Sequence, residues 1–220
     1  MAIKLFGIPI SPYVRKVAIA LREKGLLFEP VFISPFEIPT WYREEINPLG
    51  KIPGYQDEEV TLGDSSVICA YLERSHPDFP LLPKAPAVFA KALWFEEYAD
   101  GITTPVIAQE IFIPKLIAPT LFAKEVDQAR VHKAFNETLP PLCAYLEQSL
   151  AGKHFLNGER FTLGDIAIAS SFKNLALCDM ELAQDHYPNF CEYLTRIWAR
   201  PSFKAQDALE LSFIKKLQLA

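Results

Sequence analysis

The chain has 220 residues, 50% of them hydrophobic and 12% aromatic, which is enough apolar material for one or two globular domains. The net charge of −5 and the pI near 5.5 argue against a nucleic-acid-binding surface, because such surfaces need clustered lysine and arginine. The apolar stretch at the amino terminus is too short for a signal peptide or a membrane span, so we expect a cytoplasmic protein with no membrane partner.

Strand and helix signals alternate over roughly the first eighty residues. Gly25 ends the first helix, and Pro30, which has no amide hydrogen to donate, places the second strand at a sheet edge. A short polar link joins the last two strands as a hairpin, although it lacks the usual glycine. The predicted elements are a strand at 3–6, a helix at 12–24, a strand at 28–33, strands at 52–56 and 60–62, and a helix at 66–74. This order is that of a thioredoxin-like fold, in which helices cover a mixed four-stranded sheet.

Prolines recur at every third residue between Pro77 and Pro86, a spacing that neither a helix nor a strand tolerates. The stretch therefore predicts a stiff linker between two domains. The predicted limits are 1–76 for the thioredoxin-like α/β domain, 77–86 for the linker, and 87–220 for the second domain.

The second domain shows almost no period-two alternation, so we expect it to be all α-helical. Thr162 and Asp165 form a capping-box pattern at one helix start. Pro105 and the pair Pro140-Pro141 fall inside predicted helices and should kink or interrupt them. The predicted helices span about 88–112, 125–150, 163–178, 188–200 and 202–217.

Two helix starts carry the main functional signal. Ser11 precedes Pro12, so the serine caps the first helix and the proline fits the first helical position. At this positive helix end a bound thiol would lose its proton more easily. Asp64 and Ser65 begin a second helix, whose amides suit a carboxylate. Each residue also fits the simpler role of a helix cap, but a small peptide that carries a thiol and a carboxylate is the ligand these features share.

The sequence gives no metal signal. The four cysteines form no Cys-x-x-Cys pair, so we interpret them as reduced core thiols, and the four histidines lack metal-ligand spacing. We expect no metal cofactor. Arg15 is expected to lie in solvent or to have no effect on its helix dipole, and the alternative is that it lines the mouth of the binding pocket.

Four ordered segments resemble the cytosolic glutathione transferases, and the resemblance covers essentially the full chain. The segments are 11–13 (SPY), 47–53 (NPLGKIP), 64–72 (DSSVICAYL) and 161–167 (FTLGDIA). The chain differs from the common family pattern by having Asp64 where glutamate is usual and Gly54 where a bulky strand residue is usual. A cysteine is absent at the Ser11 position, which makes the thioltransferase and dehydroascorbate reductase branches of the family poor matches.

The resemblance implies a glutathione S-transferase that uses glutathione as co-substrate. Ser11 would donate a hydrogen bond to the glutathione thiolate, with Tyr13 as the rival donor. Pro53 would follow a cis peptide bond and turn the Ile52 main chain toward the cysteinyl part of glutathione. Asp64 and Ser65 would hold the γ-glutamyl end, and Lys51 would hold the glycyl carboxylate, although a lone lysine is ordinarily a solvated surface residue.

The resemblance also implies a homodimer, a role in detoxification and a second substrate. That substrate would be a small hydrophobic electrophile or a peroxide bound between the domains. Its expected apolar contacts are Ile10, Phe36, Phe112, Leu116 and Phe213. The competing hypothesis is a non-catalytic binding or regulatory protein with the same fold, since fold alone does not fix function.

Overall fold

Four short strands form one mixed sheet in the computed structural model, which describes residues 2–218. The strands are β1 (Ile3–Phe6), β2 (Phe28–Val31), β3 (Gly54–Gln56) and β4 (Thr61–Gly63), in the order β2-β1-β3-β4. β1 pairs with β2 in parallel, while the β1–β3 and β3–β4 pairs are antiparallel. The edge position predicted for β2 is therefore confirmed.

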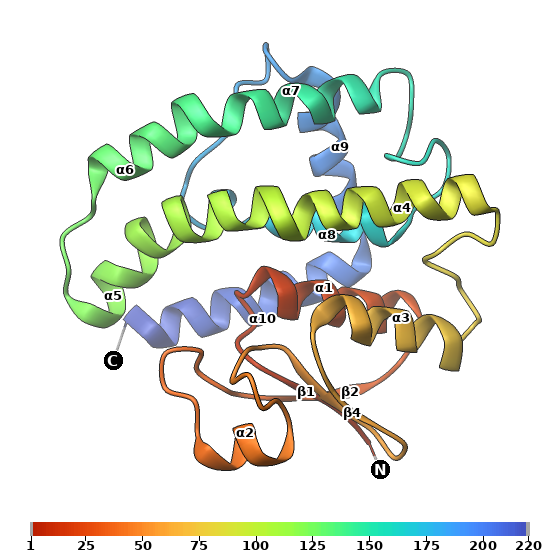
Figure 1. Cartoon of the computed structure of the whole chain (residues 1–220). Helices are drawn as coiled ribbons and strands as arrows, with labels where there is room; N and C mark the ends of the chain where they lie inside the picture. The colour runs from red at the N-terminus through yellow and green to blue at the C-terminus, as the bar shows by residue number, and fades with distance from the viewer. Residues whose placement is uncertain (1, 219–220) are drawn as a thin grey trace.

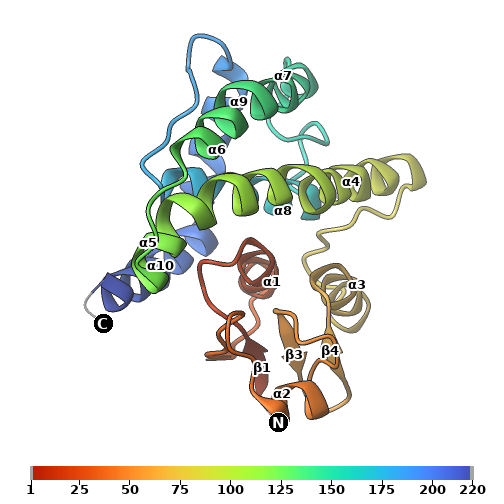
Figure 2. The ribbon, with the colours of Figure 1, turned by 60° about the vertical axis from the view of Figure 1, so that its left-hand side comes forward.

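The two helix starts singled out above lie on the same side of this sheet. Helices α1 (Pro12–Glu23) and α3 (Ser65–Ser75) pass between the sheet and the helical part of the chain, as Figure 2 shows. Helix α2 (Thr40–Glu45) lies on the other side and was not predicted. It has only six residues and no side-chain cap, so neither periodicity nor a start signal reveals it.

The rest of the chain is helical, as predicted, and stacks above the sheet in Figure 1. Several segments have wide π-helical turns and are labelled η. The elements are α4 (Pro86–Tyr98), η1 (Ala99–Thr103), η2 (Val106–Ile117), α5 (Ala118–Phe122), α6 (Gln128–Lys133), η3 (Ala134–Thr138), α7 (Leu139–Leu150), α8 (Leu163–Ala176), α9 (Pro188–Trp198) and α10 (Pro201–Gln218).

Prolines mark irregularities in the two long helical stretches where the sequence predicts. The segments Pro86–Thr103 and Val106–Phe122 meet at 43° across the break that holds Pro105. Before Pro140-Pro141 the α-helical geometry gives way to the π-helical turn η3. No single helix within residues 2–218 is long and apolar enough to cross a membrane, and this bent pair passes such a test only when its two halves are counted together.

Helix α8 is buried and organises the helical part. Its predicted capping box is present, because the Asp165 carboxylate accepts the Thr162 amide at 2.8 Å. The same carboxylate accepts the Leu156 amide at 2.9 Å and the Tyr193 hydroxyl at 3.1 Å, so it ties three segments together. Gly164 lets α4 approach closely, since a Cβ there would lie 2.8 Å from the Ala92 carbonyl oxygen.

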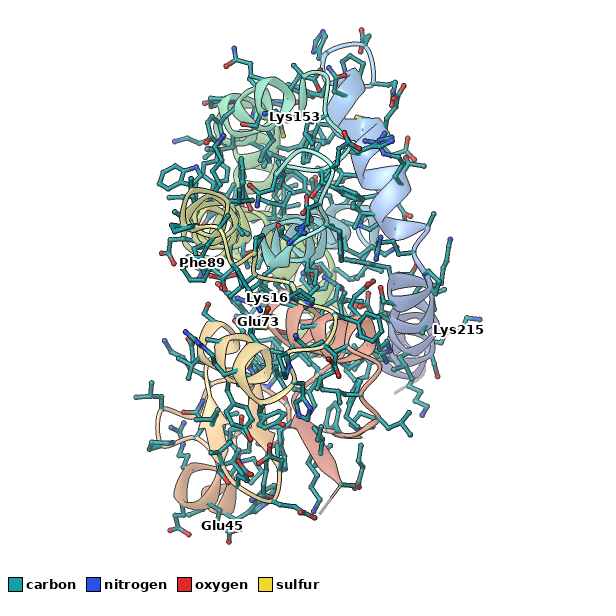
Figure 3. All side chains as sticks on the ribbon, turned by 90° about the vertical axis from the view of Figure 1, so that its right-hand side faces the viewer. Lys16, Glu45, Glu73, Phe89, Lys153 and Lys215 are labelled. Atoms are coloured by element: carbon teal, nitrogen blue, oxygen red, sulfur yellow. The ribbon has the colours of Figure 1, made fainter. Side chains whose placement is uncertain are left out.

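An ion pair between the buried Lys24 and the half-buried Glu73 holds the segment that follows α3. Lys24 Nζ lies 2.9 Å from a Glu73 carboxylate oxygen and donates to the His76 carbonyl oxygen at 2.9 Å. The Glu73 carboxylate also accepts the amides of Leu81 and Leu82 at 3.1 and 3.3 Å. Figure 3 shows Glu73 and Lys16 at the junction between the sheet and the helical part. This junction is therefore fixed by charged side chains as well as by apolar packing.

The four cysteines are free, three of them buried and Cys191 half-buried. Within residues 2–218 no group of three or more His, Cys, Asp or Glu side chains is placed to hold a metal ion.

Candidate functional site

A cleft of about 350 Å³ opens where the beginnings of α1 and α3, the loop before β3, and the junction of α4 and η1 meet. Four segments that are distant from one another in the sequence supply its walls. The lining residues are Tyr13, Asn47, Leu49, Lys51, Ile52, Pro53, Gly63, Asp64, Ser65, Ser66, Glu97, Asp100 and Gly101. The structure therefore brings together the five residues that the resemblance assigned to glutathione binding: Lys51, Ile52, Pro53, Asp64 and Ser65.

The loop before β3 is fixed from behind. The Ile52-Pro53 peptide bond is cis. The Tyr42 hydroxyl and the Asn47 side-chain amide both donate to the Lys51 carbonyl oxygen, at 2.8 Å each. These two bonds satisfy the carbonyl on the protein side and leave the Lys51 side chain exposed at the cleft.

The start of α3 presents its positive end to the cleft. Asp64 is the N-cap, and one of its carboxylate oxygens accepts the amides of Ser66 and Val67 at 2.9 and 3.0 Å. Its φ of 129° lies in the left-handed region that favours glycine. Ser65 follows it and is buried. An acidic cap on an eleven-residue helix and a serine at its first position thus share one wall.

The start of α1 is capped as predicted. Ser11 Oγ accepts the Val14 amide, although at a long 3.4 Å, and the side chain is half-buried. Ser11 is not among the residues that line the 350 Å³ cleft, whereas Tyr13, at the second position of the helix, is. Ser11 therefore lies beside the cleft rather than in its wall.

Tyr13 is held by its neighbours. Its hydroxyl donates to the Asp100 carbonyl oxygen at 3.1 Å. Burial, together with the nearby Asp100 carboxylate, raises the pKa of Tyr13 to about 12. The phenol is neutral at physiological pH, and its hydroxyl proton is already hydrogen-bonded to the Asp100 carbonyl oxygen.

A mostly buried charge cluster reaches the wall of the cleft and was not predicted from the sequence. Lys16 Nζ lies 2.6 Å from Glu96 and 2.5 Å from Asp100, and Ser66 Oγ donates to the same Glu96 oxygen at 2.5 Å. Burial would lower the Lys16 pKa, but the carboxylates overcome it and raise that pKa. For Asp100 burial is the larger effect, and the pKa of this carboxyl is raised although Lys16 opposes the shift.

A signal for this cluster did exist in the sequence. Glu96 and Asp100 are four residues apart and so lie on one face of a helical stretch. Lys16 and its neighbour Arg15 are the two charged residues inside the apolar run of residues 14–21. The sequence does not show that Lys16 contacts these two carboxylates, because that contact depends on how α4 packs over α1 and α3.

The five expected contacts of a second substrate lie elsewhere. Ile10, Phe112, Leu116 and Phe213 belong to one apolar cluster between the sheet and the helical part, and Ile10 and Phe112 are buried in it. Phe36 is exposed and packs edge-on against Phe122, with 5.4 Å between ring centroids. None of the five lines the cleft described above.

Comparison with known sequences gives the family. The chain matches the family models of the glutathione S-transferase N-terminal domain over residues 5–80 and the glutathione S-transferase C-terminal domain over residues 114–205. It is 31% identical to glutathione S-transferase 3 of Zea mays, over 74% of this chain and 73% of the relative. The chain belongs to the glutathione S-transferase family. An uncharacterized GST-like protein of Escherichia coli (strain K12), YibF, is also 31% identical, over 76% of this chain and 78% of its own.

Solved structures of glutathione S-transferases share the whole architecture. Glutathione S-transferase III in its apo form superposes with a TM-score of 0.78 at 30% identity and covers 94% of this chain and 96% of that chain. Glutathione transferase F7 from Populus trichocarpa, at 24% identity, shares the fold with a TM-score of 0.84 and covers 95% and 99%. The predicted family and the predicted architecture, a thioredoxin-like domain followed by a helical domain, are both confirmed.

Proposed function

We propose that this chain is a glutathione transferase that binds glutathione in the 350 Å³ cleft and activates its thiol for attack on a small hydrophobic electrophile or a peroxide. The observation that carries the proposal is the convergence of Lys51, Ile52, Asp64 and Ser65 on one cleft from two segments of the chain. Its walls offer a cation, a main-chain edge, a carboxylate and a helix N-terminus, which are the groups a zwitterionic tripeptide requires.

Each end of the tripeptide has a partner in this proposal. The Asp64 carboxylate faces the γ-glutamyl ammonium, and the Ser65 hydroxyl together with the amino end of α3 binds the γ-glutamyl carboxylate. The Ile52 main chain pairs with the cysteinyl unit as a one-residue strand addition. The Lys51 ammonium binds the glycyl carboxylate.

Ser11 is the proposed donor to the sulfur. A free thiol has a pKa of about 8.5, so only a few per cent is ionised at neutral pH. Lowering that pKa by about two units takes ~2.7 kcal/mol of preferential stabilisation of the thiolate. One charge-assisted hydrogen bond and a helix N-terminus can supply it. Because Ser11 Oγ already accepts the Val14 amide, its own proton is directed away from the helix.

Tyr13 is the weaker candidate on geometry. Its hydroxyl proton is bound to the Asp100 carbonyl oxygen, so donation to a sulfur would break that bond. Its raised pKa also makes the phenol a poorer acid than a free tyrosine.

The second substrate is proposed to lie beyond the sulfur, against the apolar cluster between the two parts of the chain. Leu116 and Phe213 are only partly buried there and can offer contact area, whereas Ile10 and Phe112 form the floor of the cluster. In the reaction the thiolate attacks the electrophilic carbon of an aryl halide, a carbon–sulfur bond forms, and the halide leaves with the bonding electrons.

The test combines retention on immobilised glutathione with turnover of a generic aryl halide. Wild-type protein should be retained and active, while Ser11→Ala should lose at least tenfold in turnover and stay folded, because losing a cap costs only ~1 kcal/mol. Ser149→Ala is the control for removing a serine hydroxyl away from the cleft, since Ser149 Oγ makes only a local bond on α7, in which it donates to the Tyr145 carbonyl oxygen at 2.8 Å.

Three outcomes would change the assignment. An unchanged rate in Ser11→Ala removes Ser11 as the donor. Loss of activity in Tyr13→Phe instead gives the role to Tyr13. Wild-type protein that neither binds glutathione nor turns over the aryl halide would favour a non-catalytic binding protein of the same fold.

A further inference from the structure

The turn that leads into Ser11 is held by the carboxy-terminal helix α10. Gln206 Nε2 donates to the Pro9 carbonyl oxygen at 3.1 Å, two residues before Ser11. Gln206 is almost fully buried, and its carbonyl oxygen accepts Arg22 Nη1 at 2.9 Å, so the side chain cannot swing freely. α10 runs beside α1 in Figure 1, although Pro9 and Gln206 are 197 positions apart in the sequence.

A second contact from α10 reaches the same turn through Arg15. Glu210 binds the Arg15 guanidinium with both carboxylate oxygens, at 2.6 and 2.9 Å, and both side chains are fully buried. The guanidinium also donates to the Ser170 carbonyl oxygen at 2.5 Å and to Asn174 at 2.8 Å, and it lies 3.5 Å from the Ile10 carbonyl oxygen. The sequence-based expectation that Arg15 lies in solvent is therefore wrong.

The Gln206–Pro9 bond and the Glu210–Arg15 pair both fix the backbone next to Ser11. Arg15 is one helical turn after Ser11, and its amide donates to the Ser11 carbonyl oxygen at 2.8 Å. α10 thus holds the chain on both sides of Ser11: at Pro9 through Gln206, and at the first turn of α1 through Glu210 and Arg15. A displacement of about 1 Å at a reacting group is enough to weaken catalysis severely. A hydrogen bond to a sulfur is sensitive to the same displacement.

We propose that Gln206 and the Arg15–Glu210 pair are positioning residues that set the direction of the Ser11 hydroxyl, so that thiolate stabilisation depends on α10. This inference rests on the proposed function, since it concerns the thiol bound beside Ser11. None of the three residues lines the glutathione cleft. Their effect is therefore on the ionisation of the bound thiol rather than on the affinity for the tripeptide.

The deciding measurement is the pKa of the glutathione thiol in the complex, read from the ultraviolet absorbance of the thiolate as the pH is varied. Gln206→Met keeps the side-chain length and removes the donor to Pro9. We expect it to raise the pKa of the bound thiol by about 0.5–1 unit while the glutathione dissociation constant stays within about twofold. A merely structural contact would leave that pKa unchanged.

A control variant separates the turn from general docking of α10. Asp207→Asn breaks the 2.9 Å ion pair between Asp207 and Lys173, which joins α10 to α8 without touching the turn. This variant should keep the wild-type thiol pKa. If Gln206→Met does not fold, Glu210→Asp serves instead, because it keeps the charge but pulls the guanidinium away from Ile10, and it should raise the thiol pKa in the same direction.

The possible failures are distinguishable. Wild-type protein whose bound glutathione shows no lowered thiol pKa contradicts the proposed function, and this inference with it. A lowered pKa that Gln206→Met leaves unchanged, or that Asp207→Asn raises equally, overturns only the positioning role.

Discussion

Asp64 caps α3 and is the residue proposed to bind the γ-glutamyl ammonium. Its carboxylate caps α3 through two amides, and the residue adopts a φ of 129° that most side chains avoid. Asparagine has the same size and branching as aspartate and keeps an oxygen for capping, so Asp64→Asn removes the charge with little change in the cap. Alanine removes both. The pair of substitutions therefore separates helix capping from ligand binding.

We predict that Asp64→Asn and Ser65→Ala each raise the glutathione dissociation constant about ten- to a hundredfold, because hydrogen bonds to charged groups contribute ~1.5–3 kcal/mol. Asp64→Ala should show the same loss and also a lower unfolding temperature, since the cap is gone. Calorimetric titration and thermal unfolding measure the two effects. Wild-type affinity in both Asp64→Asn and Ser65→Ala would mean that glutathione does not bind here as proposed.

The sequence predicted the residues whose role depends on local geometry. Ser11 and Asp64 were found because a capping side chain, its helix and the resulting charge are all encoded within a few positions. Lys16 and Arg15 were missed because their partners, Glu96 and Glu210, are about 80 and 195 residues away. A buried basic residue cannot be told from a solvated one in a single sequence. The packing of α4 buries Lys16, and the packing of α10 buries Arg15.

At the scale of elements, the close contact between α4 and α8 depends on the absence of a side chain at Gly164. A Cβ at Gly164 would lie 2.8 Å from both the Ala92 carbonyl oxygen and the Phe95 Cβ, neither of which can yield without moving α4. We predict that Gly164→Ala destabilises the fold by about 1–3 kcal/mol through overpacking, measured by denaturant unfolding.

Gly101→Ala is the matched control for this substitution. It adds a methyl group on an exposed helical segment, where the Cβ would meet only the Glu97 side chain at 3.2 Å. Because alanine favours helix over glycine, that variant should be as stable as wild type or more stable. A Gly164→Ala protein with wild-type stability would show that α4 shifts at little cost, and the close helix contact would then have no energetic importance.

The ends of helices with a strong periodic pattern were predicted within a few residues, whereas the short helix α2 and the π-helical turns were not predicted. α1 and α8 begin at a cap and carry continuous apolar faces, so their starts at Pro12 and Leu163 agree with the sequence. α2 has too few residues for a period to appear. The π-helical turns could not be foreseen either, because they arise where prolines and tertiary contacts alter the backbone ladder of an otherwise ordinary helical sequence.

At the scale of the whole molecule, large apolar side chains remain exposed on α3 and α4. Val67 is 50% exposed, Trp94 54% and Phe89 39%. The Trp94 indole donates to the Tyr145 hydroxyl at 2.7 Å, which holds the ring in place on the surface. A tryptophan that is both exposed and fixed contributes contact area to an interface at little entropic cost. These residues belong to the two parts of the chain, α3 beside the sheet and α4 in the helical layer.

We therefore predict a symmetric homodimer in which the sheet domain of one subunit contacts the helical domain of the other, as the family resemblance implies. Sedimentation at micromolar concentration should give about twice the chain mass of 24.8 kDa. Trp94→Glu should weaken the dimer at least tenfold, because it places a charge in the apolar part of the interface. Leu27→Glu is the control, since Leu27 is 92% exposed just before β2, away from α3 and α4 in the sequence, and its replacement should leave the dimer intact. A monomer in the wild-type protein, or equal weakening by both variants, would contradict this interface.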